Sequence, residues 1–203
     1  MENTIFGREI LDKIYKYYPK DCAFESLKYQ KSEEYIRLLK KREDACNSKD
    51  YQDFLMEQLD NIFSGYKVVN WSDLNSSNCH EFRILLHQDQ SILDDDEILM
   101  RVIGNERFDL MVFISIIEKY YYIHSNCTRY VPETNEWSFC TMDKLLPEIE
   151  DKVDKLKHFL KNEKYAELSE LLIKTIVPDI ETELEEVGDV NVFDCIFTDL
   201  IKV

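Results

Sequence analysis

Apolar residues recur every three or four positions through the first third of the chain, as they do along one face of an α-helix. The first of these stripes begins at Thr4, a possible helix cap, and ends before Pro19. Ser32 and Ser48 each stand directly before a further stripe, and serine is a preferred residue at helix N-termini. We therefore expect three helices within residues 1–65.

The middle of the chain is rich in β-branched and aromatic residues, which favour strands. One segment, 110–116, is apolar on both faces apart from Ser115, so it should be a central strand that is covered on both sides. Glu118 and Lys119 follow it and are expected to form the tight turn of a hairpin. We expect a mainly antiparallel sheet of about four or five strands, with strands near 66–71, 81–89, 110–116, 120–130 and 136–140.

A helical pattern returns after Pro147, because proline suits the first turn of a helix. Apolar stripes predict one helix from Pro147 to about Leu160 and a second over 165–176. The end of the chain is ambiguous: 179–187 is compatible with a short helix, and 190–197 with a late strand or a loop packed on the sheet.

Helices on both sides of a run of strands predict an α+β fold. We expect one domain in which N-terminal and C-terminal helices pack around the antiparallel sheet. Its parts are a helical region 1–65, a strand-rich region 66–140, a helical region 141–178 and an acidic C-terminal segment 179–203.

Acidic residues dominate the composition and narrow the choice of partners. The net charge is −16 and the isoelectric point is about 4.7, so the surface repels phosphate backbones and attracts basic proteins. Residues 81–110 carry 8 acids against 3 bases, and residues 179–203 carry 8 against 1. These two windows hold most of the excess charge, and we expect no direct contact with nucleic acid.

The chain starts without the basic and then apolar pattern of a signal peptide. No apolar run approaches the roughly 18–20 residues that span a bilayer. The six cysteines form no C-x-x-C pair, so they are expected to be reduced and mostly buried thiols. The sequence thus favours a cytoplasmic protein that does not enter a membrane.

Histidines and cysteines are the first candidates for a metal site. His80 and His87 fall on one expected strand, and His124 and Cys127 on another. Each pair is an odd number of positions apart, so a regular strand would point its two side chains to opposite faces. Zinc requires converging ligands, and we therefore predict no metal site and no cofactor.

Motifs for catalysis are also missing. The four glycines build neither a nucleophile elbow nor a phosphate-binding loop. The sequence Glu150-Asp151-Lys152 has the spelling of a nuclease motif, but it falls on the polar side of an amphipathic helix. The protein is accordingly predicted not to be an enzyme. The alternative is a hydrolase with an unrecognised site, for example one that uses His124 and nearby acids.

Four adjacent carboxylates in the stretch SILDDDEILM are the most concentrated charge in the chain. Asp94 and Glu97 have the spacing of a capping box, and Gly104 stands where the C-cap of a short helix would be. Four acids exceed what a cap needs, which leaves a surplus for a binding surface. The candidate acidic surface comprises Asp94, Asp95, Asp96, Glu97, Glu181, Glu183, Glu185 and Glu186.

Aromatic residues could anchor a partner beside this acidic surface. Tyr120, Tyr122 and Trp137 are the candidates, with burial in the core or on the sheet as the alternative for each. Three consecutive tyrosines on a strand must alternate between its two faces.

The segments LMVFISIIEKYYYIH (110–124) and PDIETELEEVGDVNVFDCIFTDL (178–200) resemble immunity proteins that neutralise bacterial polymorphic or contact-dependent toxins. Such proteins are small, cytoplasmic, acidic and free of catalytic motifs. The resemblance implies that this protein binds a cognate toxin, expected to be basic, and blocks it by direct contact. The further alternative is an acidic adaptor or nucleic-acid mimic that binds a host DNA-binding protein.

Overall fold

The computed structural model describes residues 2–87, 97–142 and 145–201, and shows an α+β fold, as expected. The helices are α1 (Glu2–Ile14), α2 (Leu27–Gln30), α3 (Glu33–Cys46), α4 (Lys49–Ile62), α5 (Glu97–Val102), α6 (Pro147–Asn162), α7 (Glu170–Ile173) and α8 (Val192–Ile196). The strands are β1 (Lys67–Asn70), β2 (Cys79–Leu85), β3 (Glu106–Ser115), β4 (Tyr120–Val131), β5 (Glu136–Thr141) and β6 (Ala166–Glu167).

The strands form one sheet in the order β1-β2-β3-β4-β5, and each of these neighbours is antiparallel. The two-residue β6 adds a parallel pairing to the first residues of β4. β3 is central, and seven of its residues in a row are buried, as expected for the apolar stretch 110–116. The hairpin turn expected at Glu118 and Lys119 connects β3 to β4.

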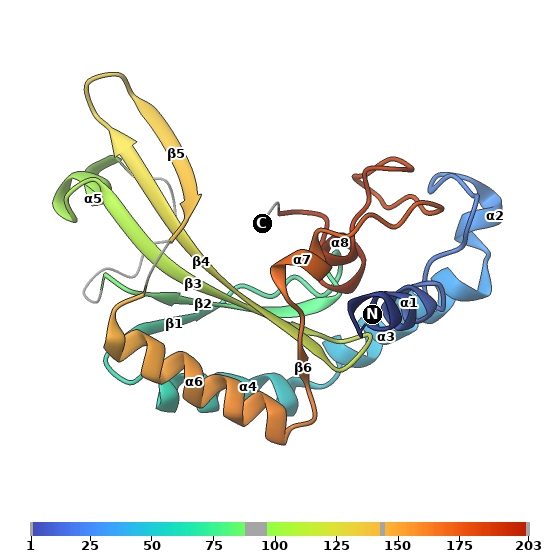
Figure 1. Cartoon of the computed structure of the whole chain (residues 1–203), viewed down its shortest axis with the longest axis horizontal. Helices are drawn as coiled ribbons and strands as arrows, with labels where there is room; N and C mark the ends of the chain where they lie inside the picture. Colours follow the sequence, from blue (N-terminus) through green and yellow to red (C-terminus); the bar gives the residue numbers. More distant parts are fainter. Residues whose placement is uncertain (1, 88–96, 143–144, 202–203) are drawn as a thin grey trace.

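The long helices α4 and α6 cover one face of the sheet (Figure 1). Their apolar stripes pack against the side chains of β2 and β3 that point to this face. Because each helix places its apolar residues three or four positions apart, one stripe of each is buried and the other side is solvated. The fully buried residues of this core include Leu55, Leu59, Phe82, Ile84, Leu110, Val112, Leu156 and Leu160.

The opposite face, which we call the groove face, is covered differently. Helices α1, α7 and α8 gather over the end of the sheet next to the β3–β4 turn, whereas the β4–β5 hairpin rises at the other end (Figure 1). The core under these helices includes Ile10, Ile14, Phe113, Phe193 and Phe197. The phenol groups of Tyr17 and Tyr18 donate hydrogen bonds to backbone carbonyls of this region, at 2.9 and 3.0 Å.

Three predictions for the last third of the chain are wrong. Residues 165–176 form β6 and the four-residue α7, since Ala166 and Glu167 pair with β4 and Ser169 caps a new helix. The segment 179–187 contains no helix. Residues 190–197 contain α8, started by a capping box between Asn191 and Asp194, where a strand or loop was expected.

Two further helices, α1 and α5, can be compared in detail with the sequence pattern. α1 begins at Glu2, so Thr4 lies inside it and does not cap it. The expected cap of α5 at Asp94 lies outside the described residues. Gly104 follows α5 with a φ of +84°, the left-handed conformation of a C-cap glycine. Among the described residues, no helix is both long and apolar enough to cross a bilayer.

Candidate functional site

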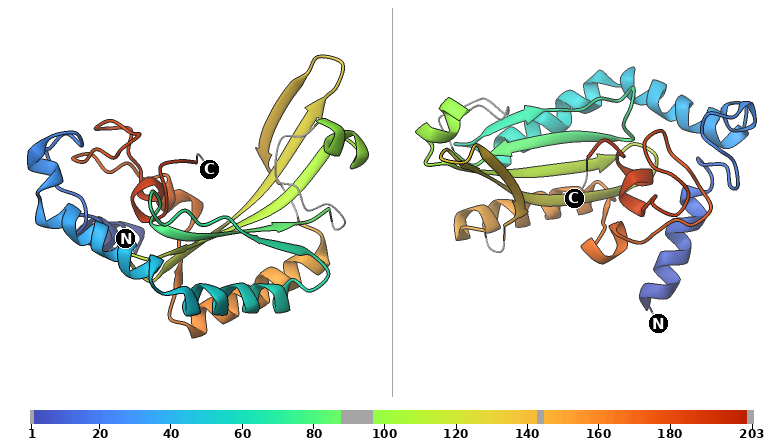
Figure 2. Two further views of the ribbon diagram at one scale, coloured as in Figure 1. Left: turned by 180° about the vertical axis from the view of Figure 1, so that it is seen from behind. Right: turned by 90° about the horizontal axis from the view of Figure 1, so that it is seen from above.

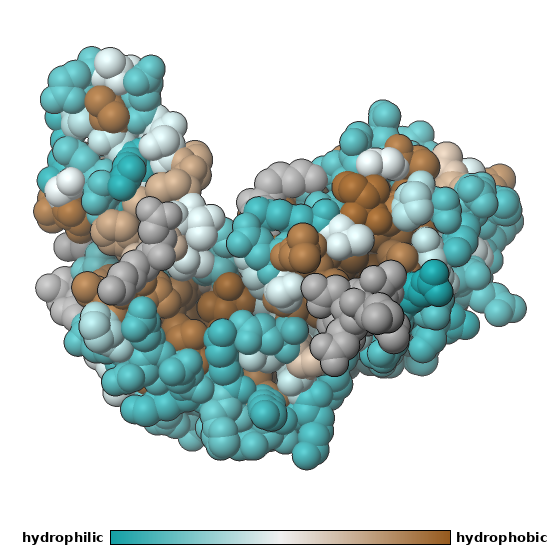
Figure 3. All heavy atoms as spheres, viewed as in Figure 1, coloured by the Kyte–Doolittle hydropathy of each residue, from teal (hydrophilic) through white to brown (hydrophobic). Residues whose placement is uncertain are grey.

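A hollow separates the β4–β5 hairpin from the C-terminal segments (Figure 3). Its floor is the groove face of the sheet, and the strand register defines which side chains share that face. Arg83 pairs with Met111, and Met111 pairs with His124. By alternation along the strands, the same face carries Trp71, Val69, Asn126, Thr128, Tyr130, Trp137 and Phe139. We call this surface the groove.

Exposed aromatic side chains lie along the groove face. Trp71 is 47% exposed and Phe139 is 61% exposed. Trp137 is half-buried, and its ring packs on Tyr130 with 4.5 Å between the ring centres. The guanidinium of Arg83 lies over Trp71 at 5.5 Å. Large aromatics that remain exposed on one face are typical of surfaces that bind another protein.

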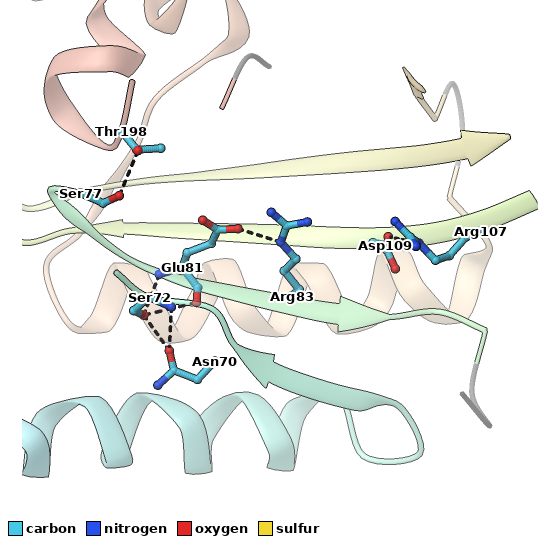
Figure 4. Close-up of polar contacts among 8 residues, drawn as sticks. All are labelled: Asn70, Ser72, Ser77, Glu81, Arg83, Arg107, Asp109 and Thr198. Carbon is cyan, nitrogen blue, oxygen red and sulfur yellow. Dashed lines mark hydrogen bonds and ion pairs between the residues drawn. The ribbon is translucent and has the colours of Figure 1, made fainter. Parts of the chain in front are cut away.

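Two ion pairs, one partly buried and one buried, form a charged row on this face of the sheet (Figure 4). Arg83 contacts Glu81 at 2.7 Å, and Arg107 contacts Asp109 at 3.1 Å. Burial raises the pKa of both carboxyl groups, and the neighbouring arginines partly offset this rise. Buried ion pairs contribute little net stability because desolvation opposes their attraction.

The predicted acidic residues are divided between the two ends of the sheet. Glu97 is exposed on α5 and lies 3.6 Å from Arg101, while Asp94, Asp95 and Asp96 lie outside the described residues. The segment 181–186 lies at the opposite end (Figure 2, right). The described acids therefore do not form one continuous patch.

Within the second acidic segment the four glutamates differ in their surroundings. Glu183 and Glu186 are exposed, and Glu185 is half-buried. Glu181 accepts a hydrogen bond from the backbone N–H of Phe24 at 3.0 Å, so its carboxylate holds the chain after α1 in place. Glu183 and Glu186 are thus the members best placed to meet a partner.

Two of the three predicted aromatic anchors are core residues. Tyr120 and Tyr122 are only 3% and 8% exposed. The hydroxyl of Tyr120 accepts a hydrogen bond from Lys13 at 2.7 Å, and Tyr122 packs against Phe193. The prediction that they are surface anchors is therefore wrong. Trp137, the third candidate, does lie on the groove.

A second candidate site was not expected from the sequence. A cavity of about 470 Å³ lies where α3 meets α4, beside the β3–β4 turn. We call it the His80 pocket. Its walls are formed by Tyr17, Lys41, Asp44, Ala45, Ser48, Tyr51, His80, Ser115, Ile116, Ile117, Glu118, Lys119 and Tyr165.

His80 is the most unusual residue of this pocket. It is 3% exposed, and its Nδ1 has no hydrogen-bond partner within the described part of the chain. Burial lowers the pKa of the imidazole to about 4, so the ring is neutral near pH 7. Its ring meets the ring of Tyr51 edge-on at 6.2 Å.

Tyr51, Tyr165 and Lys119 form a second cluster in the same pocket. The hydroxyls of Tyr51 and Tyr165 are 3.0 Å apart and share a hydrogen bond. The Lys119 ammonium lies 4.0 Å from the centre of the Tyr165 ring. Burial lowers the pKa of Lys119, against an opposing effect of Glu163. Residues 51, 80, 119 and 165 are far apart in sequence and no motif joins them, which is why the pocket was missed.

The histidine of the alternative hydrolase site has a different environment. His124 lies on the groove face close to Glu170 and Lys174, which form a 2.7 Å ion pair with each other. Burial lowers the pKa of His124, and these two charges act on it in opposite directions. In the described ranges, no three or more His, Cys, Asp or Glu side chains converge as metal ligands would.

Comparisons of the chain with protein-family models, curated proteins and solved structures find no match.

Proposed function

We propose that this protein is an immunity protein that binds a cognate bacterial toxin in the groove and neutralises it by direct contact. The observation that carries the proposal is the groove itself. The strand register places Trp71, Trp137 and Phe139 on one face of the sheet, with Glu97 near one end and Glu183 and Glu186 near the other. Aromatics in a concave surface with charge at the rim are the usual composition of a strong protein–protein interface.

The negative net charge of this protein supports the proposal that its partner is a basic protein. With a net charge of −16, the protein attracts a positively charged protein from a distance and raises the association rate, by up to about 10³-fold in favourable cases. Toxins that act on nucleic acids commonly carry basic clefts. Rapid capture is useful against a catalytic toxin, because each uninhibited molecule continues to act.

The sheet also supplies a rigid platform for such an interface. The floor of the groove contains the ion pairs Glu81–Arg83 and Arg107–Asp109, and α4 and α6 pack against the other face of the sheet. A preformed surface binds with a smaller loss of conformational entropy than a flexible one. Inhibition by blocking then requires no chemistry from this chain.

The test is whether this protein protects bacterial cells that express a toxin from a neighbouring gene, which the proposal expects to exist. Trp137→Ala and Phe139→Ala together should remove protection and weaken binding at least 100-fold, since central aromatic anchors each contribute about 2 kcal/mol or more. The matched control is Ile36→Ala, which truncates a side chain of α3 that is 54% exposed. Equal protection by the groove variant and the wild type would exclude the groove.

A pull-down from cells distinguishes the immunity function from an adaptor function. The proposal expects the neighbouring toxin to be the protein that the wild type retains and the groove variant loses. Recovery of a host DNA-binding protein in its place would support the nucleic-acid-mimic alternative.

A further inference from the structure

We propose that the His80 pocket binds a small molecule that combines an aromatic ring with one anionic group. This site is separate from the groove, and it does not depend on the proposed immunity function. The cavity of about 470 Å³ is within the usual range for small-molecule sites, about 300–1,000 Å³.

Residues that can donate hydrogen bonds, two of them lysines, line this cavity. Lys41 and Lys119 line the cavity, together with Tyr51 and Tyr165, whose hydroxyls share a hydrogen bond at 3.0 Å. Ser48 begins α4 but makes no side-chain cap to the first turn of that helix. Its hydroxyl donates instead to the Asp44 carbonyl at 2.8 Å. Because Ser48 lines the cavity, the start of the 14-residue α4 lies at its wall, where the positive end of the helix dipole is partly offset by Asp50 in the first turn.

His80 lines the pocket, and its side chain is almost fully buried. Its Nδ1 is buried without a partner among the described residues, and an unsatisfied buried polar atom typically costs about 1–3 kcal/mol. Such atoms are uncommon in folded proteins and need a reason. Because Nδ1 itself has almost no accessible surface, a ligand in the pocket meets the imidazole through the other atoms of the ring.

The protonation state of His80 favours binding over catalysis. A general base works best when its pKa is near the operating pH. Burial holds the pKa of His80 at about 4, so the neutral ring is a weak base that can accept or donate a hydrogen bond. We therefore assign to His80 a role in binding the ligand and not in catalysis.

The shape of the walls indicates the ring. Tyr17, Tyr51, Tyr165 and His80 present aromatic surfaces to one cavity, and Ile116 and Ile117 add aliphatic surface. Flat walls of this kind favour a flat ligand, because stacked or edge-on rings gain energy beyond the area that they bury.

Two carboxylates limit the charge of the ligand to a single negative group. Asp44 and Glu118 also line the cavity. Asp44 is exposed and pairs with Lys40 at 3.6 Å, which weakens but does not remove its field. With two carboxylates near two ammonium groups, a polyphosphate would be repelled, whereas a monocarboxylate can lie on the lysine side.

Titration of the full chain with four probes tests each part of the assignment. Benzoate carries both the ring and the charge, benzamide carries the ring alone, acetate the charge alone, and cyclohexanecarboxylate the charge with a body that is not flat. Amide shifts in ¹H–¹⁵N spectra should map benzoate to the pocket, with an affinity about tenfold or more above benzamide and acetate. Cyclohexanecarboxylate should bind more weakly than benzoate. Equal binding of benzoate and acetate, or no shifts with benzoate, would overturn the proposal.

Variants then show whether these side chains hold the probe. Lys119→Met keeps the length of an exposed side chain and should weaken benzoate binding about tenfold, and Tyr51→Phe should weaken it severalfold. Lys161→Met, an exposed change on the solvated side of α6, is the matched control and should bind as the wild type does. Unchanged affinity in Lys119→Met refutes the site even if a more buried variant, such as His80→Phe, fails to fold. Toxin neutralisation should be intact in Lys119→Met, so failure here is distinct from failure of the proposed function.

Discussion

Single buried side chains set how the stability of this protein depends on pH. His80 has a pKa of about 4 in the folded state, against a usual value of 6.5. Below pH 6.5 the unfolded chain takes up a proton that the folded protein refuses. The contribution of His80 is therefore present above pH 6.5 and is lost as the pH falls toward 4.

We predict that lowering the pH from 7.5 to 5 removes about 2 kcal/mol of unfolding free energy through His80. Urea unfolding at the two pH values measures this loss, and His80→Phe should lack that share of it. Glu81 and Asp109, whose pKa values are raised by burial, act in the opposite direction, and His124 acts in the same one. Glu81, Asp109 and His124 are present in both the wild type and the His80→Phe variant. The difference between the two losses of unfolding free energy therefore isolates His80. The same pH dependence in the variant would contradict the assignment.

The ion pair between Arg107 and Asp109 gives a second prediction at this scale. Their side chains are 4% and 1% exposed, so removing either partner leaves a buried charge. Asp109→Leu and Arg107→Met should each cost about 3–5 kcal/mol. The double variant should cost clearly less than the sum, because no charge then remains without its counterion. Denaturant unfolding of the wild type, the two single variants and the double variant completes a double-mutant cycle. Strictly additive losses of unfolding free energy would show that the two side chains do not act as a pair.

Among the elements, α3 and α4 make a natural comparison because a serine precedes each. The Ser32 hydroxyl accepts a hydrogen bond from the Tyr35 N–H at 3.1 Å, whereas Ser48 makes no such cap. Ser32→Ala should destabilise the protein by about 1 kcal/mol. Ser48→Ala loses only an exposed bond to a carbonyl, and we expect a clearly smaller effect. Thermal unfolding of both variants checks the order, and equal losses would contradict it.

Elements with a regular apolar period could be predicted from the sequence, and those that depend on distant contacts could not. The stripes of α3, α4 and α6 and the apolar run of β3 specify their own structure. In α8 all five residues are buried, so no polar face reveals the helical period. β6 exists because it pairs with the start of β4, and a two-residue strand leaves no pattern of its own.

The candidate sites divide in the same way into features that a local sequence pattern predicts and features that depend on distant contacts. Charge counting located the acidic segments, and strand alternation shows which residues share the groove face once the register is known. The alternation could not tell which face stays open, because that depends on where α7 and α8 pack. For this reason Tyr122 was predicted at a surface that Phe193 in fact covers. Trp137 lies on the hairpin beyond those helices.

For the whole molecule, the distribution of charge predicts association kinetics. Reversing two exposed acids, Glu183→Lys with Glu186→Lys, should slow association with the basic partner several-fold and flatten its dependence on salt. The dissociation rate should change little. The control is Glu57→Lys with Asp60→Lys, which makes the same change in net charge at exposed positions of α4. Stopped-flow measurement of the association rate at two ionic strengths compares the two double variants. Identical slowing in both would show that only the net charge of the protein matters.

The hairpin that rises beside the groove has a further consequence for the behaviour of the protein in concentrated solution. β5 is the last strand in the sheet order, and its six residues include one charged side chain, Glu136. An edge strand of low charge is a template on which a second copy of the chain can add its own strand. The shortness of β5 limits that pairing, and mutual repulsion between molecules of charge −16 opposes it at low salt. The acidity that suits a basic partner thus also keeps copies of this protein apart.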